Sequence, residues 1–136
     1  MKRIFLDTNF LMDYVEREEY KPQCIEVLIK GKEQKAKFYI SFLSLANFAY
    51  INRKKEKEIL YEALKRFVRM FNVLPNTKEH IQKAIALEAK DYEDAVQYAT
   101  AVSAGCDCIL TRNAKDFTFA TIPVLSPQEF LATLTD

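Results

Sequence analysis

The sequence predicts an α/β fold in three layers (α/β/α), with helices on both faces of a central parallel sheet of four to five strands. Short apolar runs of strand length alternate with longer stretches of helical length. The chain has only two glycines, Gly31 and Gly105, and such chains are usually rich in helix. Short apolar strands that alternate with helices are typical of a buried parallel sheet. A length of 136 residues suits one domain, which we expect to span residues 1–136.

The first half of the chain is expected to supply two strands and four helices. The expected order is a strand over 3–6, helices over 9–16 and 21–30, a strand over 38–40, and helices over 41–52 and 55–70. The strands are placed on the apolar runs. Gly31 is expected at the position after the second helix, because glycine adopts the left-handed conformation that closes helices.

The second half is expected to supply three strands and three helices. The expected order is a strand over 72–74, helices over 76–90 and 91–104, strands over 108–110 and 122–125, and a helix over 127–134. Pro75 stops the first of these strands. The stretch from Asn76 to Glu79 resembles a capping box, which opens a helix. Gly105 is expected to close the helix before the next strand.

Composition argues against several classes of protein. The net charge is +1, so any binding of nucleic acid must be local. One histidine and three cysteines without CxxC spacing argue against a zinc site and a disulfide framework. No signal peptide is visible, and no apolar stretch approaches the roughly 20 residues of a membrane span. We therefore expect a soluble, cytoplasmic protein with reduced thiols and no membrane partner.

The one basic run, Arg53-Lys54-Lys55, is followed by Glu56, Lys57 and Glu58. Because the charges are mixed, a solvated helix start or loop is favoured over a dedicated binding patch.

Polar side chains gather where the predicted strands end. Because ligands bind beyond the carboxyl ends of parallel strands, these positions are the candidates for a site. The candidates are Asp7, Thr8 and Asn9 after the first strand, Ser41 and Asn47 after the second, Thr111, Arg112, Asn113 and Asp116 after the strand over 108–110, and Asp91 and Asp94 at the start of the preceding helix. Clustered carboxylates repel one another and usually need a cation. Oxygen ligands suit Mg²⁺ or Mn²⁺.

Each candidate also has a structural interpretation. Asp7 could serve only as a helix N-cap. Asp91 is expected to cap its helix, whereas Asp94 in the first turn is favoured as a site residue. Asp116 could be an ordinary loop acid.

Asn47 lies in the stretch SFLSLANFAYI, which is apolar on nearly every face. Such a helix is expected to be buried, and a buried amide needs partners. Asn47 therefore either bonds to the backbone or lines a site.

The chain resembles the PIN-domain family (also described as PilT N-terminus-like) in the order and spacing of three stretches. These stretches are IFLDTNFLMDY, SFLSLANFAYI and DYEDAVQYATAVSAGCDCILTRNAKDF. The resemblance covers essentially the whole chain, and the last stretch is its most specific part.

This resemblance implies a Mg²⁺- or Mn²⁺-dependent ribonuclease that leaves a 5′-phosphate, of a kind that often forms the toxin half of VapC-type toxin–antitoxin pairs. It implies an RNA substrate, with an antitoxin protein and a second copy of the chain as partners. The implied metal-binding and catalytic acids are Asp7, Asp94 and Asp116, with Asn113 as a further metal ligand. Thr8, Asn9, Ser41 and Thr111 are implied as supports. Arg112 is a candidate contact to a substrate phosphate, with surface solvation as its alternative.

The sequence departs from the family pattern at two positions. Asn47 stands where family members usually carry a glutamate, and Asn113 also replaces an acid. An amide oxygen binds a hard cation more weakly than a carboxylate does, although Asp91 and Glu93 could compensate in part. The alternative function is therefore a catalytically weakened PIN-like module that binds RNA or a protein partner.

Two other interpretations compete. A phosphotransferase of the haloacid-dehalogenase kind also ends its first strand in an acid, but it needs a second aspartate where this chain has Asn9. A purely structural protein would have to treat Asp7, Asp94 and Asp116 as unrelated caps.

Overall fold

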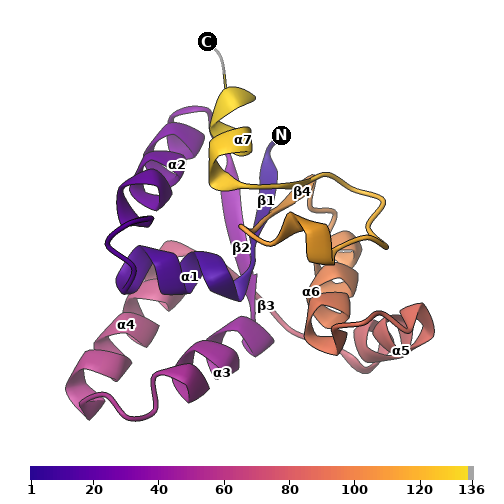
Figure 1. The fold of residues 1–136 in the computed structure, drawn as a ribbon, viewed down its shortest axis with the longest axis horizontal. Coiled ribbons are helices and arrows are strands. Elements are labelled where there is room, and N and C mark those ends of the chain that lie inside the picture. Colours follow the sequence, from indigo (N-terminus) through magenta and orange to yellow (C-terminus); the bar gives the residue numbers. More distant parts are fainter. Residues whose placement is uncertain (135–136) are drawn as a thin grey trace.

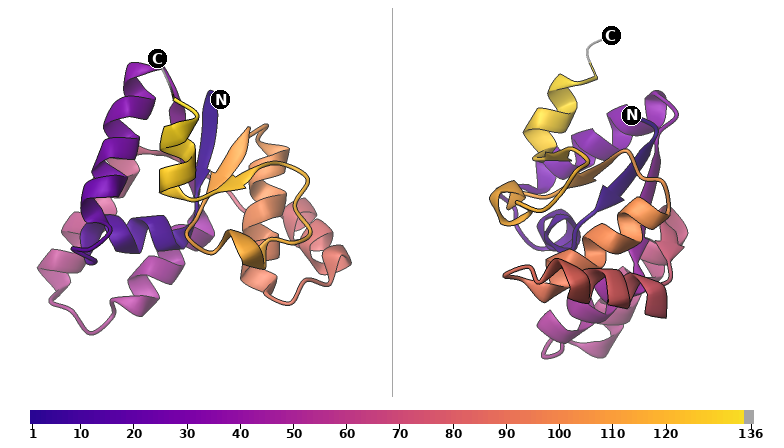
Figure 2. Two further views of the ribbon diagram at one scale, coloured as in Figure 1. Left: turned by 45° about the horizontal axis from the view of Figure 1, so that its top comes forward. Right: turned by 90° about the vertical axis from the view of Figure 1, so that its right-hand side faces the viewer.

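The computed structural model describes residues 1–134 as a three-layer α/β/α fold (Figures 1 and 2). Its central sheet has five strands in the order β3-β2-β1-β4-β5, and every neighbouring pair is parallel. The strands are β1 (Arg3–Leu6), β2 (Lys37–Ser41), β3 (Asn72–Leu74), β4 (Cys108–Leu110) and β5 (Val124–Leu125). The predicted fold class and parallel sheet are therefore confirmed.

Helices connect the strands and cover both faces of the sheet. The helices are α1 (Thr8–Val15), α2 (Lys21–Glu33), α3 (Phe42–Ile51), α4 (Lys57–Met70), α5 (Lys78–Leu87), α6 (Tyr92–Ser103) and α7 (Pro127–Ala132), with a 3₁₀ turn η1 (Ala114–Asp116) after β4. In Figure 1, α1 and α2 lie to one side of the strands, and α5 and α6 lie to the other. Within residues 1–134, no helix combines the length and apolar character needed to cross a membrane.

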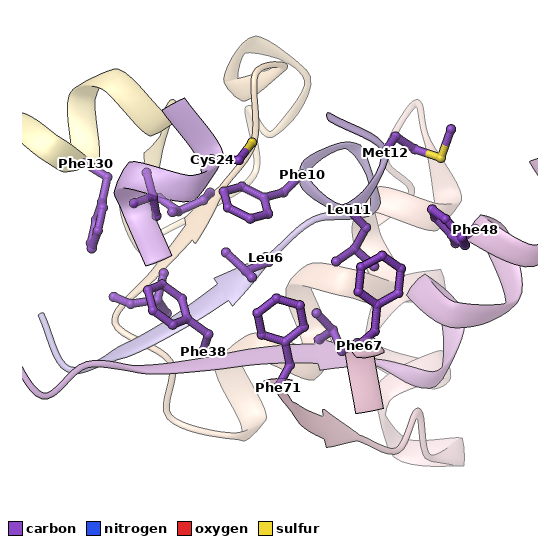
Figure 3. Packing of buried hydrophobic residues seen from close by; sticks show 14 of the residues in the cluster. Leu6, Phe10, Leu11, Met12, Cys24, Phe38, Phe48, Phe67, Phe71 and Phe130 are labelled. Carbon is purple, nitrogen blue, oxygen red and sulfur yellow. The ribbon is translucent and has the colours of Figure 1, made fainter. Parts of the chain in front are cut away.

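The larger core lies between the sheet and helices α1, α2, α4 and α7. Side chains alternate between the two faces of a strand, so Ile4 and Leu6 of β1 enter this core together. Around Leu6, Figure 3 shows Phe10 and Leu11 from α1 and Phe130 from α7. This packing fixes the start of α1, and with it the residues that follow β1.

The other face of the sheet packs against α6. Phe5 of β1 and Ile109 of β4 contact a cluster that includes Tyr98 of α6 and Phe117. Helix α5 packs outside α6 through Ala84, which meets Ala95. The small side chains along α6 therefore let this helix lie between the sheet and α5.

Helix α2 does not end at Gly31, as the sequence suggested, but continues to Glu33. Gly31 is buried inside the helix, where a Cβ would lie 2.5 Å from Cζ of Phe38. The glycine is needed for the close approach of α2 to β2. At Gly105 the prediction is confirmed, because this residue follows α6 with φ of 73°.

The capping box of α5 is shifted by one residue from its expected place. Thr77 is the N-cap, and its partner in the box is His80 rather than Glu79. Asn76 instead accepts a hydrogen bond from the backbone N–H of Leu43 and donates one to Thr100 Oγ1. The helix ends at Leu87 rather than residue 90.

Helix α3 is not buried on all sides, which corrects the expectation for residues 41–52. Ser44 and Phe48 face the core, whereas Phe42, Tyr50 and Ile51 are exposed. The helix lies at the edge of the molecule, near the carboxyl ends of the strands and beside α1 and α4 (Figure 1). Apolar composition alone did not reveal that exposure.

Candidate active site

A polar cleft of about 260 Å³ lies where β1 and β4 end. These two strands are adjacent in the sheet, although they are distant in sequence. In the sheet, β2 lies next to β1 and β5 lies next to β4, on opposite sides of the β1–β4 pair. Parallel sheets commonly bind ligands at the point between two strands whose next neighbours lie on opposite sides. The cleft is lined by Asp7, Thr8, Asn9, Asn47, Tyr50, Ile51, Asp91, Glu93, Asp94, Gln97, Asn113 and Asp116.

Asp7 occupies the N-cap position of α1, yet its side chain makes no capping hydrogen bond. Its carboxylate instead accepts a hydrogen bond of 3.1 Å from the Thr111 hydroxyl. Burial raises the pKa of Asp7 to about 6, and the bond from Thr111 opposes that rise. Capping is therefore not the role of this side chain, and its buried charge faces the cleft.

Asp94 lies in the first turn of α6 and also lines the cleft. Asp91 caps the helix, as expected, by accepting a hydrogen bond of 3.1 Å from the Asp94 backbone N–H. Burial raises the pKa of Asp94 to about 7, and repulsion from Asp7 is the next largest cause. The negative charge of Asp7 thus lies close enough to oppose the ionisation of Asp94.

Asn47 is half-buried and lines the cleft, and its amide bonds to a side chain rather than to the backbone. Its Nδ2 donates a hydrogen bond of 3.1 Å to Oε2 of Glu93. The amide of α3 therefore holds a carboxylate supplied by α6.

Gln97 is a buried residue that the sequence analysis missed. Its Oε1 accepts a bond of 2.6 Å from Ser41, and its Nε2 donates to Ser44 at 2.7 Å and to Thr8 at 3.5 Å. One amide thus joins α6 to the starts of α1 and α3. A polar residue three positions after Asp94, in an otherwise apolar part of α6, was the available signal.

Ser41 and Thr111 lie behind the cleft rather than in its lining. Ser41 is fully buried and caps α3 in a capping box with Ser44. Thr111 bonds to Asp7 and accepts a hydrogen bond from the backbone N–H of Asn113. Both therefore support residues that line the cleft, while Thr8, Asn9, Asn113 and Asp116 line it themselves.

Arg112 lies outside the cleft, although it was a candidate phosphate contact. Its guanidinium donates two hydrogen bonds, of 2.6 and 3.1 Å, to the buried carboxylate of Asp13 in α1. The guanidinium also lies 3.9 Å from the ring centre of Tyr20. Arg112 thus anchors the segment after β4 to α1, and its donors face the protein.

The side chains at the cleft fit a hard divalent cation by their chemistry. Carboxylate and amide oxygens are suitable ligands, and a cation would favour the charged forms of Asp7 and Asp94, which burial and, to a lesser extent, neighbouring acids disfavour. Within residues 1–134, no three His, Cys, Asp or Glu side chains already stand close enough to enclose an ion. An ion there would therefore also take water or substrate oxygens as ligands.

A second, larger groove of about 430 Å³ lies between α1 and α4. Val15, Ile59 and Phe67 contribute to its apolar lining. This groove is lined by two acids and two basic residues, whereas the polar cleft is lined by five acids and no basic residue, so the chemistry is assigned to the cleft at the strand ends.

The chain is similar to known proteins in sequence and in fold. The chain is similar to "Ribonuclease VapC1" of Aquifex aeolicus (strain VF5), with 29% identity over 95% of this chain and 93% of the relative. Its fold is similar to that of VapBC from Salmonella typhimurium, solved bound to DNA, with a TM-score of 0.76, 17% identity and coverage of 93% and 99% of the two chains. A toxin–antitoxin complex from Klebsiella pneumoniae gives a TM-score of 0.67, 25% identity and coverage of 91% and 97%.

The family described as "PIN domain" matches residues 3–115. This span includes eleven of the twelve residues that line the cleft. Only Asp116 lies just beyond it. Most of the chain, including strands β1 to β4, falls within this span. The chain belongs to the PIN-domain family.

Proposed function

We propose that this protein is a metal-dependent endoribonuclease of the PIN-domain type and the toxin of a toxin–antitoxin pair. The observation that carries the proposal is the convergence of Asp7 and Asp94, with raised pKa values, in a cleft at the ends of β1 and β4. The relative from Aquifex aeolicus, named as a ribonuclease, supports the reaction. The toxin–antitoxin complex from Klebsiella pneumoniae supports the biological setting.

Asp7, Asp94 and Asp116 would hold Mg²⁺ or Mn²⁺, with Asn113 as a neutral ligand. When bound, the cation supplies charge neutralisation at the scissile phosphate and a more acidic water. Thr111 keeps the Asp7 carboxylate oriented through its hydrogen bond.

The same comparisons support an antitoxin protein as a partner and RNA as the substrate. A second copy of the chain is a further proposed partner. Cys24, Cys106 and Cys108 are free and buried, which supports a reducing compartment such as the cytoplasm. Analytical ultracentrifugation of the protein alone tests self-association.

The decisive experiment measures Mn²⁺ binding by calorimetry and cleavage of a mixed RNA pool in the same samples. Wild type should bind and cleave, and Asp94→Asn should lose both while remaining folded by circular dichroism. Glu26→Gln, at an exposed position of α2, is the matched control and should behave as wild type. Cleavage by Asp94→Asn at the wild-type rate would refute the role of this acid.

A second candidate function is a PIN module with weakened or lost catalysis that binds RNA or a protein. The amide of Asn47 favours it, because this residue brings no charge of its own to the cleft and is bonded to Glu93. Asn47→Glu would then increase Mn²⁺ affinity or the cleavage rate strongly. An unchanged affinity and rate would argue against a weakened site.

A further inference from the structure

We propose that Tyr50 and Arg53, at the carboxyl end of α3, form a platform on the rim of the cleft for an unpaired base and the phosphate beside it in single-stranded RNA. This inference rests on the proposed ribonuclease function, because it names how that same cleft takes its substrate. Three observations support the platform: the stacking of Arg53 on Tyr50, the negative charge of the cleft, and the exposure of Tyr50 to solvent.

The cleft itself repels an RNA backbone. Five of its twelve lining residues are acids, and none of the twelve is basic. Arg112 cannot compensate for these acids, because its guanidinium is bonded to Asp13. Even a bound divalent cation would neutralise only part of this charge. A strand of RNA therefore needs a positive group beside the cleft that is available to phosphate.

Arg53 meets this need. Its guanidinium carbon lies 4.0 Å from the ring centre of Tyr50, and Nη1 donates a hydrogen bond of 2.8 Å to the Tyr50 carbonyl. Within residues 1–134, no carboxylate forms an ion pair with Arg53, whereas Lys55 in the same basic run pairs with Glu16. The charge of Arg53 is thus held in place and not already neutralised.

Tyr50 places this pair at the edge of the cleft. The residue lines the cleft, yet 65% of its surface is exposed to solvent. The neighbouring Ile51 also lines the cleft and is exposed. Bases stack on tyrosine rings and on guanidinium planes, and here one lies on the other.

The pair selects single-stranded over double-stranded RNA. A base in a duplex is stacked between its neighbours and cannot also stack on a side chain, whereas an unpaired base can. Stacking of this kind tolerates different bases, because every base has an aromatic face. The platform is therefore expected to distinguish unpaired from paired RNA, and to discriminate little between different base sequences.

Binding of a fluorescein-labelled single-stranded 12-nucleotide RNA, followed by anisotropy in EDTA, tests the platform without cleavage. Tyr50→Ala should weaken binding about tenfold, and Tyr50→Phe should bind as wild type because the ring remains. Arg53→Gln should weaken binding and reduce the slope of log affinity against log salt by about 0.7. The same RNA annealed to its complement should be bound equally by wild type and Tyr50→Ala.

The matched controls are Tyr61→Ala and Arg69→Gln on α4, both at exposed positions. Neither should change the affinity. An equal loss in Tyr61→Ala and Tyr50→Ala, or an equal affinity of Tyr50→Ala and wild type, would overturn the proposal. A change in sedimentation of Tyr50→Ala without a change in RNA affinity would instead assign this surface to contacts between copies of the chain.

Cleavage assays in Mn²⁺ separate this proposal from the one on which it rests. If the platform is correct, Tyr50→Ala raises KM about tenfold and leaves kcat close to that of wild type. If wild type cleaves RNA and Tyr50→Ala has an unchanged KM, the platform is refuted and the nuclease stands. If wild type neither binds nor cleaves RNA, both proposals fail together.

Discussion

The hydroxyl of Thr111 donates a hydrogen bond of 3.1 Å to the buried carboxylate of Asp7, joining the end of β4 to the end of β1. This bond is the direct side-chain link between the two strands at the cleft. It also opposes the rise in the pKa of Asp7 that burial produces. Thr111 therefore controls both the orientation and the ionisation of the acid.

Thr111→Val should show how the stability of the fold and the pKa of Asp7 depend on the Thr111 hydroxyl. The variant keeps the shape of the side chain but removes the side-chain donor to a buried carboxylate, which keeps only the backbone N–H of Thr8, at a cost of about 1 to 3 kcal/mol in the free energy of unfolding. The pKa of Asp7 should rise further, so the pH at which cleavage reaches half its maximum should move upward. Urea unfolding and a pH–rate profile measure the two effects. Thr118→Val, at an exposed loop position, should change neither.

Asp94→Asn should stabilise the metal-free protein at pH 8. The pKa of Asp94 is raised in the fold from 3.8 to about 7, so its neutral form is favoured in the folded state. The contribution to stability is therefore complete below about pH 4 and is lost as the pH rises through 7. Thermal unfolding in EDTA should show a higher Tm for the variant at pH 8 and a clearly smaller difference at pH 5. A lower Tm for the variant at pH 8 would contradict the cost of burying the Asp94 charge beside other acids.

Gln97→Leu should remove the hydrogen bonds that hold α6 against the starts of α1 and α3 at the cleft. Removal of the amide deletes its buried hydrogen bonds with Ser41 and Ser44, whose hydroxyls keep only their capping-box contacts, at a cost of about 1 kcal/mol for each bond. The variant should unfold at lower urea concentration and bind Mn²⁺ more weakly. Gln128→Leu, on the exposed side of α7, is the control that should retain both properties.

Arg112→Met should destabilise the fold, because it leaves the buried carboxylate of Asp13 paired only with Arg17. Breaking one side of a buried ion pair costs about 3 to 5 kcal/mol, and the remaining pair with Arg17 should keep the loss near the lower value. Adding Asp13→Asn to Arg112→Met should recover part of the lost free energy of unfolding, because the buried negative charge is then removed. Urea unfolding of the single and double variants measures this coupling, and a further loss in the double variant would contradict it.

Local patterns were sufficient to predict the strands and the acids that follow them. The apolar run before Asp7 and the run before Thr111 each fixed a strand end, and a parallel sheet brings such ends to one edge. The start of α6 was also predictable, because Asp91 has the capping role that its position indicates.

Features that depend on distant packing partners were not predictable. The sequence around Gly31 is typical of a helix end, and only the approach of Phe38 explains why the helix continues. Arg112 resembles a free phosphate ligand until the fold brings it to Asp13. The exposure of Tyr50 depends on where α3 lies relative to the sheet, which its composition does not encode.

The hydrogen bond between Asp7 and Thr111 spans 104 positions of the chain. During translation Asp7 leaves the ribosome early, whereas Thr111 and Asp116 emerge only after β1, β2, β3 and α6. A growing chain therefore carries an incomplete cleft until the segment after β4 has emerged. If the chain is the proposed nuclease, this order of assembly delays cleavage of RNA until Thr111 and Asp116 have joined Asp7 at the cleft.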